Sequence, residues 1–390
     1  MRPASSPIRV PARIPSVATP WRVALVHDWL TGMRGGERAL EAICELFPDA
    51  TRFALFHVPG SVSGTIEARP VRTSFIQRLP RSHRYYRQLL PLFPAAIEQF
   101  DLDDFDLIIS TSHCAAKSVV PPGRTPHLCY CFTPMRYAWD QFDAYFGPDR
   151  VGASVTRMFR WGLSAMARWD VATAGRVSRY VAISQYVAGR IRRYYNRDAR
   201  VVYPPVDTAF FRPSGEPPGG YLLIVSALVP YKRVDRAIRA CALAGAPLRI
   251  VGSGTELARL RDAAGPSVQF LGALSDEQVR AAYQGAAAIL LPGIEDFGIV
   301  PVEAQACGRP VIALAQGGAC ETVVDGSTGV LVADPTDTAF AEAIDRVRRG
   351  RFDVATIRQH AVRFSRERFQ AAFRQQVHQV MRKPIERVVQ

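Results

Sequence analysis

Short apolar runs alternate with stretches of helical periodicity along most of the chain. Between two such runs, apolar residues at Leu40, Ile43, Cys44 and Phe47 recur at the spacing of one helix face. The apolar runs predict buried strands at Trp21–His27, Asp106–Ser110, Arg179–Ile183, Tyr221–Val225, Ile289–Leu291 and Val311–Leu314. Alternating strands and helices of this kind predict an α/β protein whose parallel sheets are covered by helices on both faces.

A cluster of Pro and Gly at 201–220 interrupts this alternation and marks a domain boundary. We therefore predict two Rossmann-like domains, at 21–200 and 201–365, and 390 residues are enough for each to bury its own core. Residues 1–20, rich in Pro, Ser and Arg, are predicted to be a disordered lead-in. Residues 366–390 are predicted to be a basic, helical extension.

Composition indicates a soluble globular protein, with 48% hydrophobic and 22% charged residues. No apolar run approaches the roughly 20 residues of a membrane-spanning helix, and the N-terminus lacks the apolar core of a secretory signal. The seven cysteines show no zinc-site spacing, so we expect reduced, packed thiols in a cytoplasmic protein.

The net charge of +14 favours an anionic partner. No nucleic-acid-binding motif is visible, which leaves membrane phospholipid or a lipid diphosphate. Segment 78–100 combines Arg81, Arg84 and Arg87 with aromatic residues and leucines at helical spacing. Such a segment suits a lipid interface, and it equally suits an amphipathic helix that packs on its own domain.

Residues 289–313 carry the most chemical information. An apolar strand leads into a loop with Glu295 and Gly298, and we expect Pro301 to open a helix that ends at Gly308. Glu303 would then lie in the first helical turn. A glycine-containing loop before a helix presents free N–H groups to an anion, and carboxylates can accept hydrogen bonds from sugar hydroxyls. The stretch therefore predicts a site for a nucleotide-sugar, although two acidic residues considered alone are most often solvated.

A second strand, glycine-rich loop and helix begins the chain, with Gly32, Gly35 and Gly36 in a pattern that is not the dinucleotide fingerprint. His113 follows the predicted strand 106–110. Ligands bind beyond the carboxyl ends of the strands in such sheets. With two sheets facing each other, the cleft between the domains is the expected site.

Two glutamates separated by seven residues, within EDFGIVPVEAQACGRPVIA, resemble the signature of retaining glycosyltransferases of family 4. The stretches VHDWLTGMRGGER, CYCFTPMRYAWD, VVYPPVD and ALVPYKRVD extend this resemblance over residues 21–380. It implies a GT-B fold, with two Rossmann-like domains whose parallel sheets face a central cleft. Within the family, the sequence looks like bacterial enzymes that transfer mannose from GDP-mannose in polysaccharide assembly.

The resemblance also implies roles for particular residues. Lys232 would bind the donor diphosphate with help from Arg233, and Gly35 and Gly36 would let their loop approach the phosphate. His113 would lie near the reacting sugar.

The remaining implied contacts come from the stretch around 295–303. Glu303 would hold the nucleotide ribose. Glu295 would hold the donor sugar hydroxyls together with the backbone N–H groups of Phe297, Gly298 and Ile299.

The chain departs from the family pattern at two positions. Phe132 stands where close relatives have histidine, which removes one polar contact near the sugars. Ala227 stands where many members have arginine, which places more of the charge neutralisation on Lys232 and Arg233.

No metal or other cofactor is expected besides the donor. The acidic run at 101–106 precedes a strand and is interpreted as a solvated loop. The implied acceptor is a saccharide or a polyprenyl-diphosphate-linked precursor, handled on the inner face of the membrane.

Three alternatives to this donor and activity remain. They are a glycosyltransferase that uses a UDP-sugar, a phosphorylase-like enzyme, and a non-catalytic basic GT-B protein that binds membranes or nucleic acid. The phosphorylase would need a pyridoxal lysine and a much longer chain. The presence of Glu295, Lys232 and Glu303 favours an enzyme over a binding protein.

Overall fold

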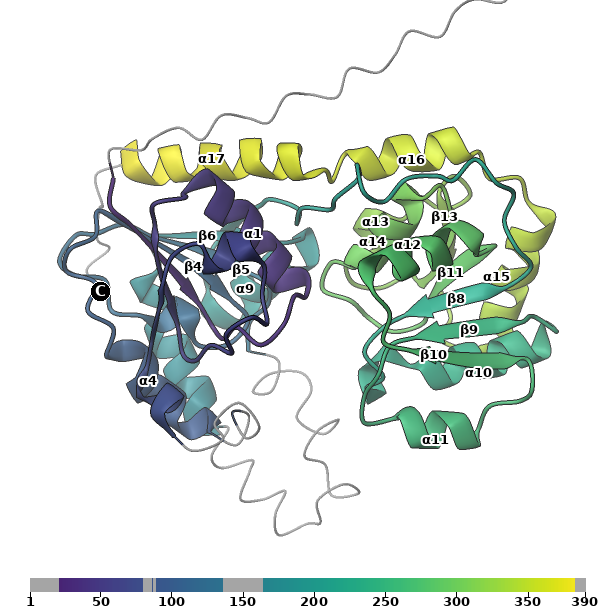
Figure 1. The fold of residues 1–390 in the computed structure, drawn as a ribbon, viewed down its shortest axis with the longest axis horizontal. Helices are drawn as coiled ribbons and strands as arrows, with labels where there is room; N and C mark the ends of the chain where they lie inside the picture. Colours follow the sequence, from purple (N-terminus) through teal and green to yellow (C-terminus); the bar gives the residue numbers. More distant parts are fainter. Residues whose placement is uncertain (1–20, 80–85, 87–88, 136–163, 383–390) are drawn as a thin grey trace, which may run out of the picture.

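The computed structural model describes residues 21–79, 86, 89–135 and 164–382 of the chain. Within these residues the chain forms two α/β lobes, one after the other in sequence, that lie side by side (Figure 1). Arg81, Arg84 and Arg87 of the proposed lipid-contacting segment lie outside the described residues.

The N-terminal lobe is built on a seven-stranded sheet in the order β3-β2-β1-β4-β5-β6-β7. All neighbouring strands pair in parallel. The central strands are buried along their whole length because helices cover both faces. The strands are β1 (Val23–His27), β2 (Thr51–Ala54), β3 (Val71–Thr73), β4 (Leu107–Ser112), β5 (His127–Cys131), β6 (Arg179–Ala182) and β7 (Ala199–Val201). The helices are α1 (Gly35–Leu46), α2 (Gly64–Glu67), α4 (Phe93–Glu98), α9 (Gln185–Tyr195) and the helical residues 164–172.

The C-terminal lobe repeats this plan with six parallel strands in the order β10-β9-β8-β11-β12-β13. Its strands are β8 (Leu222–Val225), β9 (Leu248–Val251), β10 (Val268–Gly272), β11 (Ala288–Leu291), β12 (Val311–Leu314) and β13 (Gly329–Val332). Its helices are α10 (Val234–Leu243), α11 (Leu257–Asp262), α12 (Asp276–Gly285), α13 (Ile299–Ala306), α14 (Ala319–Thr322), α15 (Asp337–Arg349) and α16 (Val354–Val362).

In both sheets the strand order reverses direction at one place, between β1 and β4 in the first and between β8 and β11 in the second. Connections from the two strands at such a point run to opposite sides, which leaves a crevice at their carboxyl ends. The predicted α/β architecture with two Rossmann-like parallel sheets is confirmed. Its two reversal points are where ligand-binding residues are expected.

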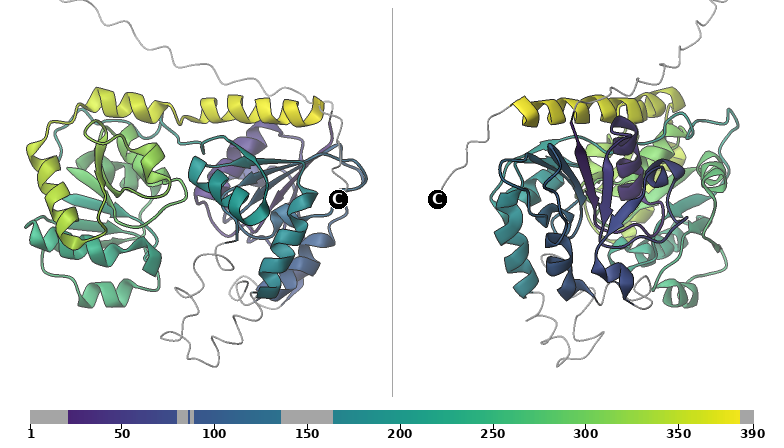
Figure 2. Two further views of the ribbon diagram at one scale, coloured as in Figure 1. Left: turned by 180° about the vertical axis from the view of Figure 1, so that it is seen from behind. Right: turned by 60° about the vertical axis from the view of Figure 1, so that its left-hand side comes forward.

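The last helix, α17 (Arg366–Arg382), leaves the C-terminal lobe and runs back along the N-terminal lobe (Figures 1 and 2). Phe369 and Phe373 place their rings 5.5 and 5.7 Å from the ring of Tyr130 in β5. Arg366 pairs with Glu41 and Glu45 of α1, each at 2.6 Å. The extension predicted after residue 365 is thus a helix that completes the core of the first lobe.

One expectation about packing needs correction, and one of the two alternatives for segment 78–100 gains support. Cys320 is exposed, whereas the other six thiols are buried as expected, and all seven are free. In segment 78–100, Tyr86 and Phe93 turn inward, with their rings 5.2 and 6.0 Å from Trp29. These two rings therefore favour packing of the segment on its own domain, whereas Leu92 is exposed. No helix in the described part of the chain is long and apolar enough to cross a membrane.

Candidate active site

The loop between β11 and α13 is held by the glycines that follow β12. Gly318 donates its N–H to the Glu295 carbonyl at 2.8 Å. Gly317 has φ +69°, and any Cβ there would collide with the same carbonyl oxygen. Only glycine therefore lets this turn pack so closely on the backbone of Glu295.

Helix α13 begins earlier than expected. Gly298, with φ +88°, is its N-cap and Ile299 is its first residue, so Pro301 is the third helical residue. Proline is still tolerated there because N–H groups in the first turn have no helical partner. Glu303 consequently lies in the second turn, which corrects its predicted place in the first.

Glu303 is buried, and its Oε2 accepts a hydrogen bond from the hydroxyl of Tyr283 at 2.9 Å. Burial raises the pKa of this carboxyl, while the hydrogen bond from Tyr283 and the nearby Arg38 guanidinium oppose the rise. Tyr283 in α12 thus fixes the carboxylate expected to hold the ribose.

Lys232 and Glu295 form an ion pair, with Nζ on Oε1. Lys232 ends the short 3₁₀ helix η5 (Pro230–Lys232) after β8, and Glu295 follows β11, so the pair spans the reversal point of the second sheet. Both side chains are largely buried, at 16% and 13% exposure. Two residues with separate predicted roles toward the donor are therefore in direct contact.

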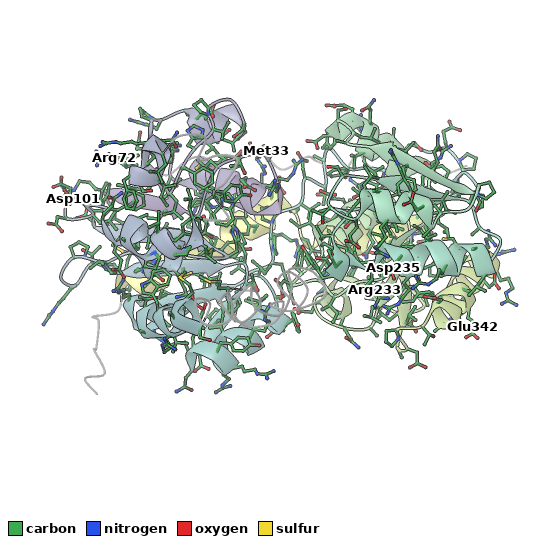
Figure 3. The ribbon with its side chains drawn as sticks, turned by 90° about the horizontal axis from the view of Figure 1, so that it is seen from below. Met33, Arg72, Asp101, Arg233, Asp235 and Glu342 are labelled. Atoms are coloured by element: carbon green, nitrogen blue, oxygen red, sulfur yellow. The ribbon has the colours of Figure 1, made fainter. Side chains whose placement is uncertain are left out.

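Arg233 has a different arrangement from that expected of a phosphate ligand. Its backbone is left-handed, with φ +51°, and its side chain pairs with Asp235 through two hydrogen bonds of 3.1 Å (Figure 3). Burial would raise the pKa of Asp235, but Arg233 and Arg239 lower it to about 2. Arg233 is thus already neutralised in this structure.

The N-terminal lobe brings the β1–α1 loop to this site. Figure 3 shows Met33, in that loop, on the side of its lobe nearest the C-terminal lobe. A Cβ added to Gly35 would lie 2.6 Å from Cδ1 of Ile299, the first residue of α13. Gly36 faces Phe132, whose ring would lie 3.3 Å from an added Cβ. The glycines therefore permit close approach to the other lobe and to Phe132.

His113 directly follows β4, at the reversal point of the first sheet. Its Nδ1 lies 3.0 Å from Oδ2 of Asp28, and its ring meets Trp29 edge-on with 4.5 Å between centroids. The centroid of Phe132 is 6.4 Å from that of His113. Phe132, which departs from the family pattern, thus contributes an apolar wall beside His113.

Further contacts join the lobes around the Glu295 loop. Arg190 of α9 donates to Oδ1 of Asp296 at 2.9 Å and to Thr133 at 2.7 Å. The hydroxyl of Ser184 donates to the Asp296 carbonyl at 2.5 Å. The two bonds to Asp296, the residue after Glu295, thus connect the N-terminal lobe to the Glu295 loop.

Two more interlobe contacts lie farther from the loop. Glu321 accepts the N–H groups of Gln185 and Tyr186 at the start of α9, at 2.8 and 3.0 Å. Arg38 of α1 makes two hydrogen bonds to Asp276 of α12, at 2.8 and 2.7 Å.

Phe297 and Ala227 complete the set of predicted positions. The Phe297 ring is buried against Tyr203 and Phe364. The backbone of Phe297, and not its ring, is therefore the part that can contact a ligand at this loop. Ala227 is exposed just after β8.

The acidic run at 101–106 lies at the opposite, amino end of β4, with all four aspartates exposed. Figure 3 shows Asp101 at the edge of the lobe away from the site. Among the described residues no group of three His, Cys, Asp or Glu side chains could hold a metal.

The sequence reasoning missed Asp28, Tyr283 and the Arg190–Asp296 pair. Asp28 directly follows a buried strand in a predicted ligand loop, and this position was an available signal. Tyr283 and Arg190 have no such signal, because their partners come from other elements.

Comparison with known protein families gives matches over most of the chain. Residues 33–210 match the family described as Glycosyltransferase Family 4. Residues 207–366 match Glycosyl transferases group 1. The two matches thus fall one in each lobe.

Among characterised relatives, the chain is 36% identical over 195 residues to D-inositol 3-phosphate glycosyltransferase of Mycobacterium tuberculosis. The same identity is found with the enzyme of this name from Mycobacterium bovis. The alignment covers 43% of this chain and 41% of each relative, so the chain spans less than half the length of these proteins.

Solved structures resemble the whole fold. HepE of Anabaena, crystallised with UDP-glucose, superposes with a TM-score of 0.65 at 19% identity, covering 92% of this chain and 99% of that one. Sucrose-phosphate synthase of Thermosynechococcus elongatus gives a TM-score of 0.60 at 18% identity, covering 93% and 98%. These likenesses confirm the GT-B fold.

Proposed function

From a glycosyltransferase match in each lobe of a GT-B fold, we propose a retaining glycosyltransferase that moves a hexose from a nucleotide-sugar to an acceptor hydroxyl. The observation that carries this proposal is the Lys232–Glu295 pair at the reversal point of the second sheet. Beside it lie the N-terminus of α13 and, from the other lobe, Gly35. A cation, a carboxylate and free helix N–H groups suit a ligand that is part diphosphate and part polyol.

The donor binds by replacing the contact between Lys232 and Glu295. The diphosphate takes the Lys232 ammonium, and the sugar hydroxyls donate to the Glu295 carboxylate. Tyr283 holds Glu303 for the ribose hydroxyls. Each group of the donor thus meets a side chain that another residue already orients.

In the transfer step, the bond between the anomeric carbon and the β-phosphate oxygen breaks, and its electron pair stays on that oxygen. The acceptor oxygen forms the new bond on the same face, and its proton passes to the departing phosphate. Lys232 and the N–H groups at the start of α13 stabilise the growing negative charge. Nucleoside diphosphate and the glycoside are the products, and no metal or further cofactor takes part in this proposal.

We propose GDP-mannose as the donor, because the stretch 295–313 resembles mannosyl-transferring enzymes. HepE, a structural relative, was crystallised with UDP-glucose, which makes UDP the competing nucleotide. The proposed acceptor is lipid-linked or a polysaccharide precursor, and the protein would work on the cytoplasmic face of a membrane. D-inositol 3-phosphate, named in the mycobacterial relatives, is the soluble alternative.

Two experiments test this function. Isothermal titration with GDP, UDP and ADP should show tightest binding of GDP, and a tenfold preference for UDP, about 1.4 kcal/mol, would refute the donor. Labelled GDP-mannose, UDP-glucose and UDP-galactose should then be incubated with polyprenyl-linked acceptors or D-inositol 3-phosphate. Label transferred by the wild-type protein and not by Glu295→Ala supports an enzyme. Tight nucleotide binding with no transfer to any acceptor would favour the non-catalytic alternative.

A further inference from the structure

Asp28 is a buried carboxylate beside the site that accepts hydrogen bonds on both of its oxygens. It directly follows β1 and is completely buried. Oδ2 accepts the backbone N–H groups of His113 and Cys114 at 2.7 and 3.0 Å. Oδ1 accepts those of Ala115 and Ala116 at 2.6 and 2.7 Å. The turn after β4 is therefore wrapped around this one side chain.

The same carboxylate also holds the ring of His113. Nδ1 lies 3.0 Å from Oδ2, and the edge-on contact with Trp29 restricts the ring from another side. The His113 side chain remains 31% exposed, so its outer edge is accessible. Backbone and ring of His113 are thus both fixed by Asp28.

The charge of Asp28 decides which ring nitrogen carries the proton. Burial would raise the pKa of Asp28, but a charged His113 and the hydrogen bonds from His113 lower it to about 2. Because four backbone N–H groups also donate to this carboxylate, it stays ionised when His113 is neutral. An ionised carboxylate can only accept hydrogen bonds, so a neutral His113 must carry its proton on Nδ1. Nε2 then bears the lone pair, on the opposite side of the ring from Asp28.

We propose that Asp28 is a positioning residue that locks His113 in the Nδ1–H tautomer, so that Nε2 accepts a hydrogen bond from a substrate hydroxyl. This rests on the proposed function, since a sugar supplies the hydroxyl. His113 thus accepts a hydrogen bond from a polyol. Asp28 does not contact the substrate, and it affects turnover only by orienting the His113 ring.

The tautomer can be read directly by ¹⁵N NMR of the full-length protein with labelled histidine, at a pH where the ring signals are those of neutral imidazole. His113→Gln identifies the signal of His113 by its disappearance. Wild-type protein should show a protonated Nδ1 and an unprotonated Nε2. In Asp28→Asn the side-chain amide can donate, and the signal should move toward the Nε2–H tautomer. A wild-type spectrum with the proton on Nε2 overturns the proposal.

Kinetics separate positioning from a structural effect. Asp28→Asn should lower kcat by about tenfold to a hundredfold, as expected for a partner that orients a functional ring, while the donor KM stays within about twofold. In a His113→Gln background the same substitution should have almost no further effect on kcat. Equal losses in both backgrounds would show that Asp28 merely supports the fold and would refute the proposal.

A matched control is Asp106→Asn, at the other end of β4, where an exposed carboxylate accepts the N–H of Arg22 at 2.8 Å. It should leave both the tautomer and kcat unchanged. If the wild-type protein transfers no sugar from any donor, the proposed function fails. The NMR spectra would still decide whether Asp28 sets the tautomer.

Discussion

The Nζ atom of Lys232 and the Oε1 atom of Glu295 form an ion pair across the carboxyl ends of β8 and β11, although 63 positions separate the residues. The two opposite charges neutralise each other. In the proposed function a donor replaces this contact, so substitutions of Glu295 and of Lys232 should have different effects on donor binding and transfer.

Glu295→Ala is expected to lower transfer by about a hundredfold or more, the usual cost of losing a preorganised group at a reacting centre. GDP should bind nearly as well as before, because Lys232 is retained. Titration with GDP beside a transfer assay measures both effects. Loss of GDP binding in this variant would show that Glu295 holds the nucleotide or the fold instead of the sugar.

Lys232→Ala should weaken the binding of GDP and donor alike, and should also slow transfer by about a hundredfold. The leaving phosphate loses its nearest cation, and the alanine at 227 supplies no replacement. Near-normal transfer by this variant would mean that the site has been assigned wrongly.

Arg190→Ala is expected to reduce transfer by about tenfold, or roughly 1.4 kcal/mol in activation free energy. The substitution removes the bond to Asp296 that holds the Glu295 loop from the other lobe, and the bond to Thr133 within the N-terminal lobe. Arg192→Ala is the matched control on the same helix, since its pair with Asp198 is exposed. Equal effects of the two substitutions would argue against a role for the interlobe contact.

Lys117→Met should destabilise the N-terminal lobe by about 3 kcal/mol or more. Lys117 and Asp170 are buried and paired at 3.0 Å, and removing Lys117 leaves the Asp170 charge buried without this counter-ion. Urea unfolding measures the loss. Arg22→Met breaks only exposed pairs with Asp104 and Asp106 and should cost less than about 1 kcal/mol.

Acid should destabilise the protein through His127, because burial lowers its pKa to about 3 from an ordinary value of 6.5. Between these values the unfolded chain binds the extra proton, so stability falls as the pH drops below 6.5. From pH 7 to pH 5 this contributes about 2 kcal/mol. Urea midpoints at pH 7 and pH 5 should therefore differ less in His127→Gln than in the wild-type protein. The same difference in both would contradict a buried, neutral His127.

Binding to anionic liposomes is predicted from the charge of +14 and from segment 78–100. Co-sedimentation should weaken as salt screens the charges. It should also weaken when Arg81, Arg84 and Arg87 are changed to Glu. Binding that is unaffected by salt and by these substitutions would show that this segment is not the membrane contact.

The two-sheet architecture could be predicted because it is encoded locally. The run Ile289–Leu291 and the glycines around it identify a strand, loop and helix without any knowledge of distant residues. Helix α13 begins directly after Gly298 and not at Pro301, because the positive φ of the N-cap favours glycine there. Local patterns define the elements more reliably than their first residues.

Contacts between distant elements could not be predicted in this way. Asp28 accepts hydrogen bonds from the backbone N–H groups of four residues that lie 85 to 88 positions later in the chain. Because every residue type except proline has such an N–H group, residue identities do not indicate these donors. Glu321 caps a helix that begins 136 positions earlier. The roles given to Lys232, Glu295, Glu303 and His113 toward a donor remain predictions, but the structure places them where such roles are possible.

Helix α17 has a consequence for synthesis on the ribosome. The first lobe needs Phe369 and Phe373 against Tyr130, so it cannot finish folding until almost the whole chain has been made. Chains usually fold their N-terminal domain first as they emerge. In this protein the C-terminal lobe can complete its sheet before α17 is made. Until then, the Tyr130 side of the first lobe stays uncovered. Truncation before residue 366 should therefore damage the lobe that is farthest away in sequence.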